Sequence, residues 1–316
     1  MNPGPRPLPD VLAGRAFSLA EGRTAGLSPA ELDGSGLRRP TRGIRTAEPA
    51  PRPGDVVARC CELLPALPPA AVFSHATALD LLEVDRPRGL RRPDDVHVEV
   101  PHTVRRPRRN GVVSHSRPAD AREPVLIRHG LPVVLAARLW VQLAGELDGV
   151  ELVVLGDALV RRQRPRAALR DLERAVDRLA PGTRGARRLR DALPLVRAGT
   201  DSCQETRLRL ALVGAGLPCP EVNRPVHDRD GRFVALPDLS YRQQRVGIEY
   251  DGDVHRTEPR AWRRDVARRQ ALEHAGWRLI TCTADDVRDP ARAVTWIRAA
   301  LATDPRRVSG NRPGSS

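Results

Sequence analysis

Acidic side chains gather in two neighbouring segments with strand character in the last third of the sequence. The first segment, RFVALPDLSY, carries Asp238, and the second, RVGIEYDG, carries Glu249 and Asp251. A polar turn centred between Gln243 and Gln244 joins them into a predicted hairpin. In that register Asp238 and Glu249 lie directly opposite each other.

Two carboxylates in this arrangement can hold a hard metal ion. Cross-strand neighbours have Cβ atoms about 4.5–5.5 Å apart, a distance at which carboxylates repel unless a cation lies between them. Asp251 shares the face of Glu249 because side chains alternate along a strand. Gly247 and Gly252 leave room for a substrate backbone to approach. We therefore predict that Asp238, Glu249 and Asp251 bind Mg²⁺ or Mn²⁺, which prefer oxygen ligands.

Each acid also has a purely structural interpretation. Asp238 can begin a turn, and Glu249 with Asp251 can form a solvated strand face. Upstream, Ser202 and Glu205 have the spacing of a capping box, in which the glutamate only closes a helix N-terminus. The convergence of the strand acids favours a functional site, while capping and catalysis both stay open for Glu205.

The elements that must position these acids follow from the pattern of residues 201–302. The expected elements are a helix ending at Gly214 or Gly216, three antiparallel strands, a helix over 259–275, a strand at 277–281 and a helix at 289–301. The prediction is an α+β domain with the order helix, three strands, helix, strand, helix.

The stretch from Glu205 to Val287 resembles very-short-patch-repair-like endonucleases of the PD-(D/E)XK superfamily. The resemblance rests on the spaced pattern iEyDG, H, D, R, L and GW in the last third of the chain. It implies a restriction-endonuclease-like α-βββ-α-β fold and a metal-dependent nuclease. Asp238 would be a metal ligand, Glu249 the second acid and Glu205 an upstream acid.

The same resemblance assigns roles to three further side chains. His255 would lie near the scissile phosphate, and Asp265 with Arg268 would form a polar pair on the helix, although such a pair is more often a plain surface ion pair. The superfamily pattern ends in Lys, which here falls at Asp251. Because Arg stays protonated, His255 or the metal ion must activate the water.

The charge of the chain favours a polyanionic partner such as DNA. The net charge is +14, yet residues 201–302 hold 17 Arg against 15 Asp or Glu, so the excess lies elsewhere. All 53 basic residues are Arg, which points to a composition bias and makes the location of the charge more informative than its total. The predicted nucleic-acid-binding residues are Arg38, Arg39, Arg42, Arg105, Arg106, Arg108 and Arg109. The alternative is an ordinary solvated surface.

The part before residue 200 divides into three predicted segments. Residues 10–47 read as two short helices, the second starting at Pro29, and a basic extended piece, as in a winged helix-turn-helix; a small helical hairpin is the alternative. Residues 48–164 read as a small mixed α/β domain, with a helix over 73–82 and strands starting at Val96 and Gly111. Both segments resemble the AbiEi-type antitoxin family. Residues 165–200 form an Arg-rich helical connector, and 303–316 a flexible tail.

The remaining histidines and the cysteines are interpreted as ordinary side chains. His75, His97, His102, His115 and His129 lack a Cys or carboxylate set that completes a metal site, so we expect polar or half-buried roles. The five cysteines show no metal-ligand or disulfide spacing and read as reduced thiols. No segment has the length and apolarity of a membrane span. The expectation is a cytoplasmic protein.

Two functions of different classes fit these observations. The first is a Mg²⁺-dependent DNA endonuclease or nickase with a basic N-terminal region that binds nucleic acid or a protein partner of a toxin–antitoxin or defence system. The second is a non-enzymatic, antitoxin-like or transcriptional DNA-binding regulator that keeps a degenerate nuclease fold. The absent Lys and the predicted winged helix favour the second.

Overall fold

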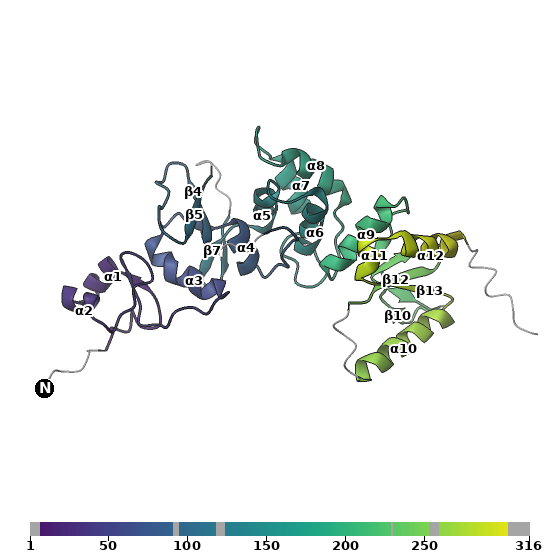
Figure 1. Cartoon of the computed structure of the whole chain (residues 1–316), viewed down its shortest axis with the longest axis horizontal. Helices are drawn as coiled ribbons and strands as arrows, with labels where there is room; N and C mark the ends of the chain where they lie inside the picture. The colour runs from purple at the N-terminus through teal and green to yellow at the C-terminus, as the bar shows by residue number, and fades with distance from the viewer. Residues whose placement is uncertain (1–6, 91–94, 118–123, 229, 253–258, 303–316) are drawn as a thin grey trace, which may run out of the picture. The chain divides into compact units, whose positions relative to one another are not determined.

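The computed structural model describes residues 7–90, 95–117, 124–228, 230–252 and 259–302, without the side chains of residues 259–266. The fold is mixed α/β and divides into two compact units, Met1–Gly145 and Glu146–Ser316 (Figure 1). The predicted tail at 303–316 lies outside the described residues. No helix in the described ranges combines the length and the apolarity that crossing a membrane requires.

The N-terminal unit opens with two short strands that bracket two short helices. The elements are β1 (Phe17–Ser18), α1 (Leu19–Thr24), α2 (Pro29–Asp33) and β2 (Ile44–Arg45), with β1 and β2 antiparallel. The predicted helix start at Pro29 is confirmed. It follows a capping box in which the Glu31 N–H donates to Ser28 Oγ and the Ser28 N–H donates to the Glu31 carboxylate. Phe17 and Leu32 are buried in the small core between the helices.

A five-stranded sheet forms the rest of this unit. In spatial order its strands are β5 (Val112–Arg117), β4 (Val96–Pro101), β3 (Val72–Phe73), β7 (Leu131–Val133) and β6 (Leu126–Arg128). The accompanying helices are α3 (Val56–Leu63), α4 (His75–Leu81) and α5 (Ala136–Leu143). The predicted strands at 96 and 111 do pair, and the pairing is parallel. The helix predicted over 73–82 is shorter, because Phe73 belongs to β3 and Ser74 is the N-cap.

The C-terminal unit begins with four helices, of which two are joined by buried charge. They are α6 (Gly149–Leu159), α7 (Leu169–Asp177), α8 (Ala186–Ala192) and α9 (Cys203–Gly214). Asp157 of α6 accepts a 2.7 Å hydrogen bond from Arg209 of α9, and both side chains are at most 1% exposed. Glu151 and Arg207 form a second pair at 2.7 Å. The predicted domain at 48–164 includes α6, whereas the division into two compact units places α6 with α9.

A four-stranded sheet carries the predicted acidic face. Its order is β13 (Arg278–Cys282), β12 (Val246–Tyr250), β11 (Leu239–Tyr241) and β8 (Glu221–Val222), with β12 and β13 parallel and the other pairs antiparallel. Leu239 pairs with Ile248, and Tyr241 with Val246. The register predicted from the turn at Gln243 is therefore confirmed for these pairs.

The predicted set of three continuous strands is wrong in one respect. Residues Val226–His227 and Phe233–Ala235, strands β9 and β10, form a separate two-stranded sheet. Pro225 and Pro237 lie at the breaks, and proline cannot donate a hydrogen bond to a strand neighbour. The last predicted helix, at 289–301, is confirmed as α12 (Ala291–Ala302), and a short helix that was not predicted, α11 (Ala284–Arg288), precedes it, with Pro290 between the two.

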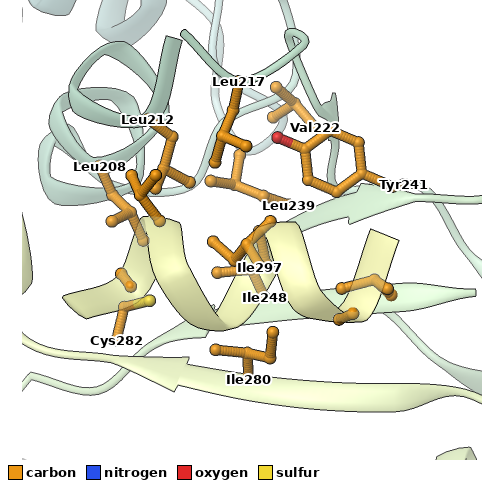
Figure 2. Packing of buried hydrophobic residues seen from close by; sticks show 14 residues of the cluster. Leu208, Leu212, Leu217, Val222, Leu239, Tyr241, Ile248, Ile280, Cys282 and Ile297 are labelled. Atoms are coloured by element: carbon orange, nitrogen blue, oxygen red, sulfur yellow. The ribbon is translucent and has the colours of Figure 1, made fainter. Parts of the chain in front are cut away.

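Helices cover both faces of the four-stranded sheet. On one face Leu208 and Leu212 of α9 and Ile297 of α12 pack against Ile248 and Ile280 (Figure 2). On the other face lie α10 (Pro259–His274) and the β9–β10 sheet, with a core of Val226, Ala235, Leu272 and Trp277. Because side chains alternate along β12, Glu249 points away from the Ile248 core.

Candidate functional site

Three carboxylates from three elements converge beside strand β12. Glu205 is in the first turn of α9, Asp238 directly precedes β11, and Glu249 lies in β12. Glu205 and Glu249 are only 5% and 9% exposed. Continuing the β11–β12 register beyond Leu239 places Asp238 across from Glu249, as the sequence predicted.

The surroundings of Asp238 disfavour its ionised form. Burial raises the pKa of Asp238 to about 7, and the negative charges of Glu205 and Glu249 add to the effect. The Tyr250 N–H, which donates to Asp238 Oδ2 at 2.8 Å, and the charge of Arg268 oppose it. Without a cation, this carboxyl is partly protonated near neutral pH.

Glu205 reaches the cluster through a partner that the sequence analysis missed. Its Oε2 accepts hydrogen bonds from the Asp201 N–H and from Asn223 Nδ2, both at 3.0 Å. Its own N–H donates to Ser202 Oγ at 3.2 Å, so half of the predicted capping box is present. Asn223 is buried and has a left-handed φ of 45°, which Asn tolerates better than most residues. The sequence signal that could have identified Asn223 is its position two residues before Pro225, because Asn and Pro are both common in turns.

Glu249 is held by an arginine of the covering helix. Arg268 of α10 donates from Nη2 to Glu249 Oε2 at 2.9 Å, and its Nη1 lies 2.6 Å from Oε1. The Nη2 contact is a charge-assisted hydrogen bond, and the Nη1 contact is an ion pair without hydrogen-bond geometry. Sequence analysis paired Arg268 with Asp265, whose side chain lies outside the described residues. Arg268 therefore has Glu249 as a partner, and its pairing with Asp265 stays a prediction.

Two predicted site residues are not placed in the cluster by the described structure. The Asp251 N–H donates to the carbonyl oxygen of Cys282 at 2.8 Å, which extends the β12–β13 pairing by one residue. His255 lies outside the described residues. Within the described ranges, Asp238, Glu249 and Asp251 do not bring one ligand oxygen each to within 4.8 Å of one another. Metal binding by all three would therefore require side-chain rotation.

The cluster nonetheless fits a divalent cation by its charge. Arg268 pairs with Glu249 and acts on Asp238, and the Arg162 guanidinium interacts electrostatically with Glu205. Burial and the charges of Glu205 and Glu249 raise the pKa of Asp238, so a cation beside this carboxyl would favour its ionised form. The donor set is oxygen, which suits Mg²⁺ or Mn²⁺. Asp238 and Glu249 are the residues that would hold such an ion.

A basic groove lies in the N-terminal unit. It has a volume of about 1050 Å³ and is lined by Arg42, Arg105, Arg106, Arg108 and Arg109, together with Pro40 and Asn110. Arg109 Nη1 donates to the Arg42 carbonyl oxygen at 2.7 Å. Among described residues, the guanidinium groups of Arg105, Arg106 and Arg108 have no hydrogen bond or ion pair.

Two of the predicted DNA-binding arginines have structural partners instead. Arg38 pairs with Glu62 and donates to the carbonyl oxygens of Glu48 and Pro49. Arg39 lies 3.4 Å from Asp33 and donates to its carbonyl oxygen. The structure thus brings five of the seven predicted arginines together at the groove and leaves Arg38 and Arg39 in local contacts.

Three histidines that the sequence analysis interpreted as ordinary side chains also lie together. The ring centroids of His75 and His115 are 3.6 Å apart, and His97 Nδ1 is 3.1 Å from His115 Nε2. Burial lowers the pKa of His75 to about 3 and that of His115 to about 4, and the neighbouring rings contribute. All three rings are therefore neutral near pH 7.

Comparisons with known proteins identify relatives without an assigned activity. No known family profile matches the sequence. Over 171 residues the chain is 30% identical to the uncharacterized proteins MT2308 and Rv2248 of Mycobacterium tuberculosis, which covers 54% of this chain and 61% of theirs. The crystal structure of the RV2827C protein from Mycobacterium tuberculosis has a TM-score of 0.38 and 18% identity, over 67% of this chain and 83% of that chain.

Proposed function

We propose that the C-terminal unit hydrolyses phosphodiester bonds of DNA with Mg²⁺ as its cofactor, as a restriction-endonuclease-like and very-short-patch-repair-like domain would. The observation that supports this most is the convergence of the buried carboxylates of Glu205, Asp238 and Glu249, with the pKa of Asp238 raised to about 7. Several carboxylates buried close together repel one another at a cost in stability, which a bound divalent cation offsets.

The residues take different roles in this reaction. Asp238 and Glu249 would hold the ion, which polarises the scissile phosphate and lowers the pKa of water when it is bound. Asn223 and the Ser202 cap keep Glu205 turned toward Asp238. Arg268 neutralises Glu249 in the metal-free state and can turn toward a phosphate, since a guanidinium binds phosphate and carboxylate with the same fork.

DNA is the proposed substrate because of the basic groove in the N-terminal unit. Guanidinium groups that lack protein partners are available to phosphate oxygens, and each such contact releases condensed counterions from the nucleic acid. The winged-helix-like segment before residue 47 can add further contacts. A cytoplasmic location and a protein partner from a defence system remain part of this proposal.

Plasmid nicking tests the enzyme directly. The intact chain with Mg²⁺ should convert supercoiled plasmid to nicked or linear forms, and Asp238→Asn and Glu249→Gln should each reduce the rate by at least about 100-fold, because each removes a charge from the ion's ligand set. Asp230→Asn is the matched control, since Asp230 lies in an exposed turn of the same unit. Cleavage that survives Asp238→Asn, or that persists in EDTA, contradicts the proposal.

A DNA-binding regulator is the second candidate, and the Arg268–Glu249 pair is the observation that favours it. With Glu249 paired to the Arg268 guanidinium, and Asp251 at the position where the superfamily keeps Lys, the cluster can persist without a metal ion. In that case, calorimetry should detect no binding of Mg²⁺ or Mn²⁺ that depends on Asp238. Wild type and Asp238→Asn should then give the same titration. DNA binding then survives Asp238→Asn and is lost when Arg105, Arg106 and Arg108 become Ala.

A further inference from the structure

Three histidines from distant parts of the N-terminal unit meet beside the five-stranded sheet. His75 is the first residue of α4, His97 lies in β4 and His115 lies in β5. One ring nitrogen from each lies within 4.8 Å of the others, and no other trio of His, Cys, Asp or Glu in the described ranges has this geometry. We propose that these three histidines bind a divalent transition-metal ion of the Zn²⁺ class.

The spacing of the ring nitrogens matches the coordination sphere of such an ion. Zn²⁺ holds imidazole nitrogens at about 2.0–2.1 Å, so two of them on a tetrahedral ion lie about 3.3 Å apart. The observed distance from His97 Nδ1 to His115 Nε2 is 3.1 Å. One of these nitrogens must carry a proton when no ion is bound, and on binding that proton moves to the ring nitrogen that faces away.

His75 is presented to this pair by a rigid frame. Its Nδ1 lies 3.1 Å from Ser74 Oγ, and Ser74 is fully buried, which leaves Nε2 as the nitrogen available to an ion. The His75 N–H donates to Gln142 Oε1 at 3.0 Å. The backbone of His75 has a left-handed φ of 50°, a conformation that a non-glycine residue keeps only where its surroundings impose it.

The same frame extends to a buried carboxylate on the strand that carries His97. Gln142 Nε2 donates to Glu99 Oε2 at 2.6 Å, and Glu99 is 4% exposed. Gln142 therefore connects the His75 backbone to Glu99 through its two amide atoms. This connection fixes the backbone position from which the His75 ring projects.

The ligand type selects the ion and separates this site from the acidic cluster. Neutral imidazole nitrogens suit Zn²⁺, Co²⁺, Ni²⁺ and Cu²⁺, whereas Mg²⁺ and Mn²⁺ prefer oxygen. All three rings are half-buried, so a fourth position on the ion stays open to water or to a donor from another molecule. Binding would tie α4 to β4 and β5, the strand pair whose connection carries Arg105 to Arg109.

Metal titration of the full chain, without an affinity tag of histidines, tests the proposal. The protein is stripped with EDTA, dialysed, and titrated with Zn²⁺ by calorimetry and with Co²⁺ by visible absorption. One equivalent of Co²⁺ should give the intense bands of a tetrahedral ion. His97→Ala and His115→Ala should weaken binding at least about 100-fold, because even loss of an outer hydrogen-bond partner costs about 10- to 100-fold.

Two control variants test whether metal binding depends on these three histidines in particular. His102→Ala removes a histidine just beyond β4, and Asp238→Asn disables the acidic cluster; both should leave the Co²⁺ spectrum unchanged. His75→Gln serves as a second test if an alanine variant loses its circular dichroism spectrum. Binding that a folded His97→Ala or His75→Gln variant retains, or the absence of a tetrahedral Co²⁺ spectrum in the wild type, overturns the proposal.

Discussion

Replacing Asp238 by Asn should make the metal-free protein more stable above pH 7. The pKa of this carboxyl rises from 3.8 to about 7 on folding, chiefly by burial and then by the charge of Glu205. One pKa unit corresponds to about 1.36 kcal/mol, so the ionised carboxylate costs the folded state at most about 4 kcal/mol. Asn keeps the oxygen that accepts the Tyr250 N–H and carries no charge.

The pH dependence of this gain has a definite sign. A carboxyl with a raised pKa in the folded state contributes stability that is fully present below its unfolded pKa and is lost as pH rises through the folded pKa. Wild type and Asp238→Asn should therefore be equally stable near pH 4. The difference should grow between pH 4 and pH 7 and stay constant above pH 7.

Hydrogen exchange of peptides from β12 and β13, measured against urea in EDTA, reports the free energy of unfolding for this unit. Asp230→Asn is the control, with an expected change within about 0.5 kcal/mol because its side chain is 74% exposed. Adding Mg²⁺ at about 100 times its dissociation constant should stabilise the wild type by about 2.7 kcal/mol and leave the variant unchanged. A variant less stable than the wild type at pH 8 in EDTA refutes the reasoning.

Two further outcomes test the groove and the helical part of the C-terminal unit. The triple variant Arg105→Ala/Arg106→Ala/Arg108→Ala should bind DNA more weakly and should reduce the steepness of log affinity against log salt by about 0.9 for each lost phosphate contact. The control Arg39→Ala, which removes a group paired with Asp33, should leave this slope unchanged. Fluorescence anisotropy at several salt concentrations measures both slopes. Arg209→Leu should destabilise the unit by about 3–5 kcal/mol in urea, because it leaves the Asp157 charge buried without its cation. Asp157→Leu/Arg209→Leu should recover only part of the loss, because the Arg197 N–H and the Thr206 hydroxyl then lose their acceptor; equal stability of the single and double variants would contradict this account.

Local sequence patterns predicted those features of the acidic site that depend on nearby residues. The polar turn at Gln243 and Gln244 determined the β11–β12 register, because a hairpin with a short turn leaves few ways to pair its strands. Period-two alternation then placed Ile248 in the core and Glu249 on the opposite face. The split of the first two strands was missed, since Pro225 and Pro237 act on hydrogen bonding and not on the hydrophobic pattern.

Contacts between distant segments escaped the sequence analysis for a physical reason. His97 and His115 are 18 residues apart, and they share a face only because β4 and β5 pair in parallel, with Glu99 beside His115. Arg38 and Arg42 look alike in sequence, yet only Arg38 has Glu62 within reach. Such pairings depend on tertiary register, which composition and periodicity leave undetermined.

The charge balance of the acidic cluster connects the two proposed functions. In the metal-free state, a proton on Asp238 and the guanidinium of Arg268 both reduce the negative charge of the cluster around Asp238 and Glu249. A divalent ion supplies the same charge once the proton has left and Arg268 has turned aside. A nuclease and a degenerate binder therefore share one resting state, and they differ in whether Mg²⁺ can displace that proton and that guanidinium. The stability difference between wild type and Asp238→Asn, measured with and without Mg²⁺, reads out this exchange directly.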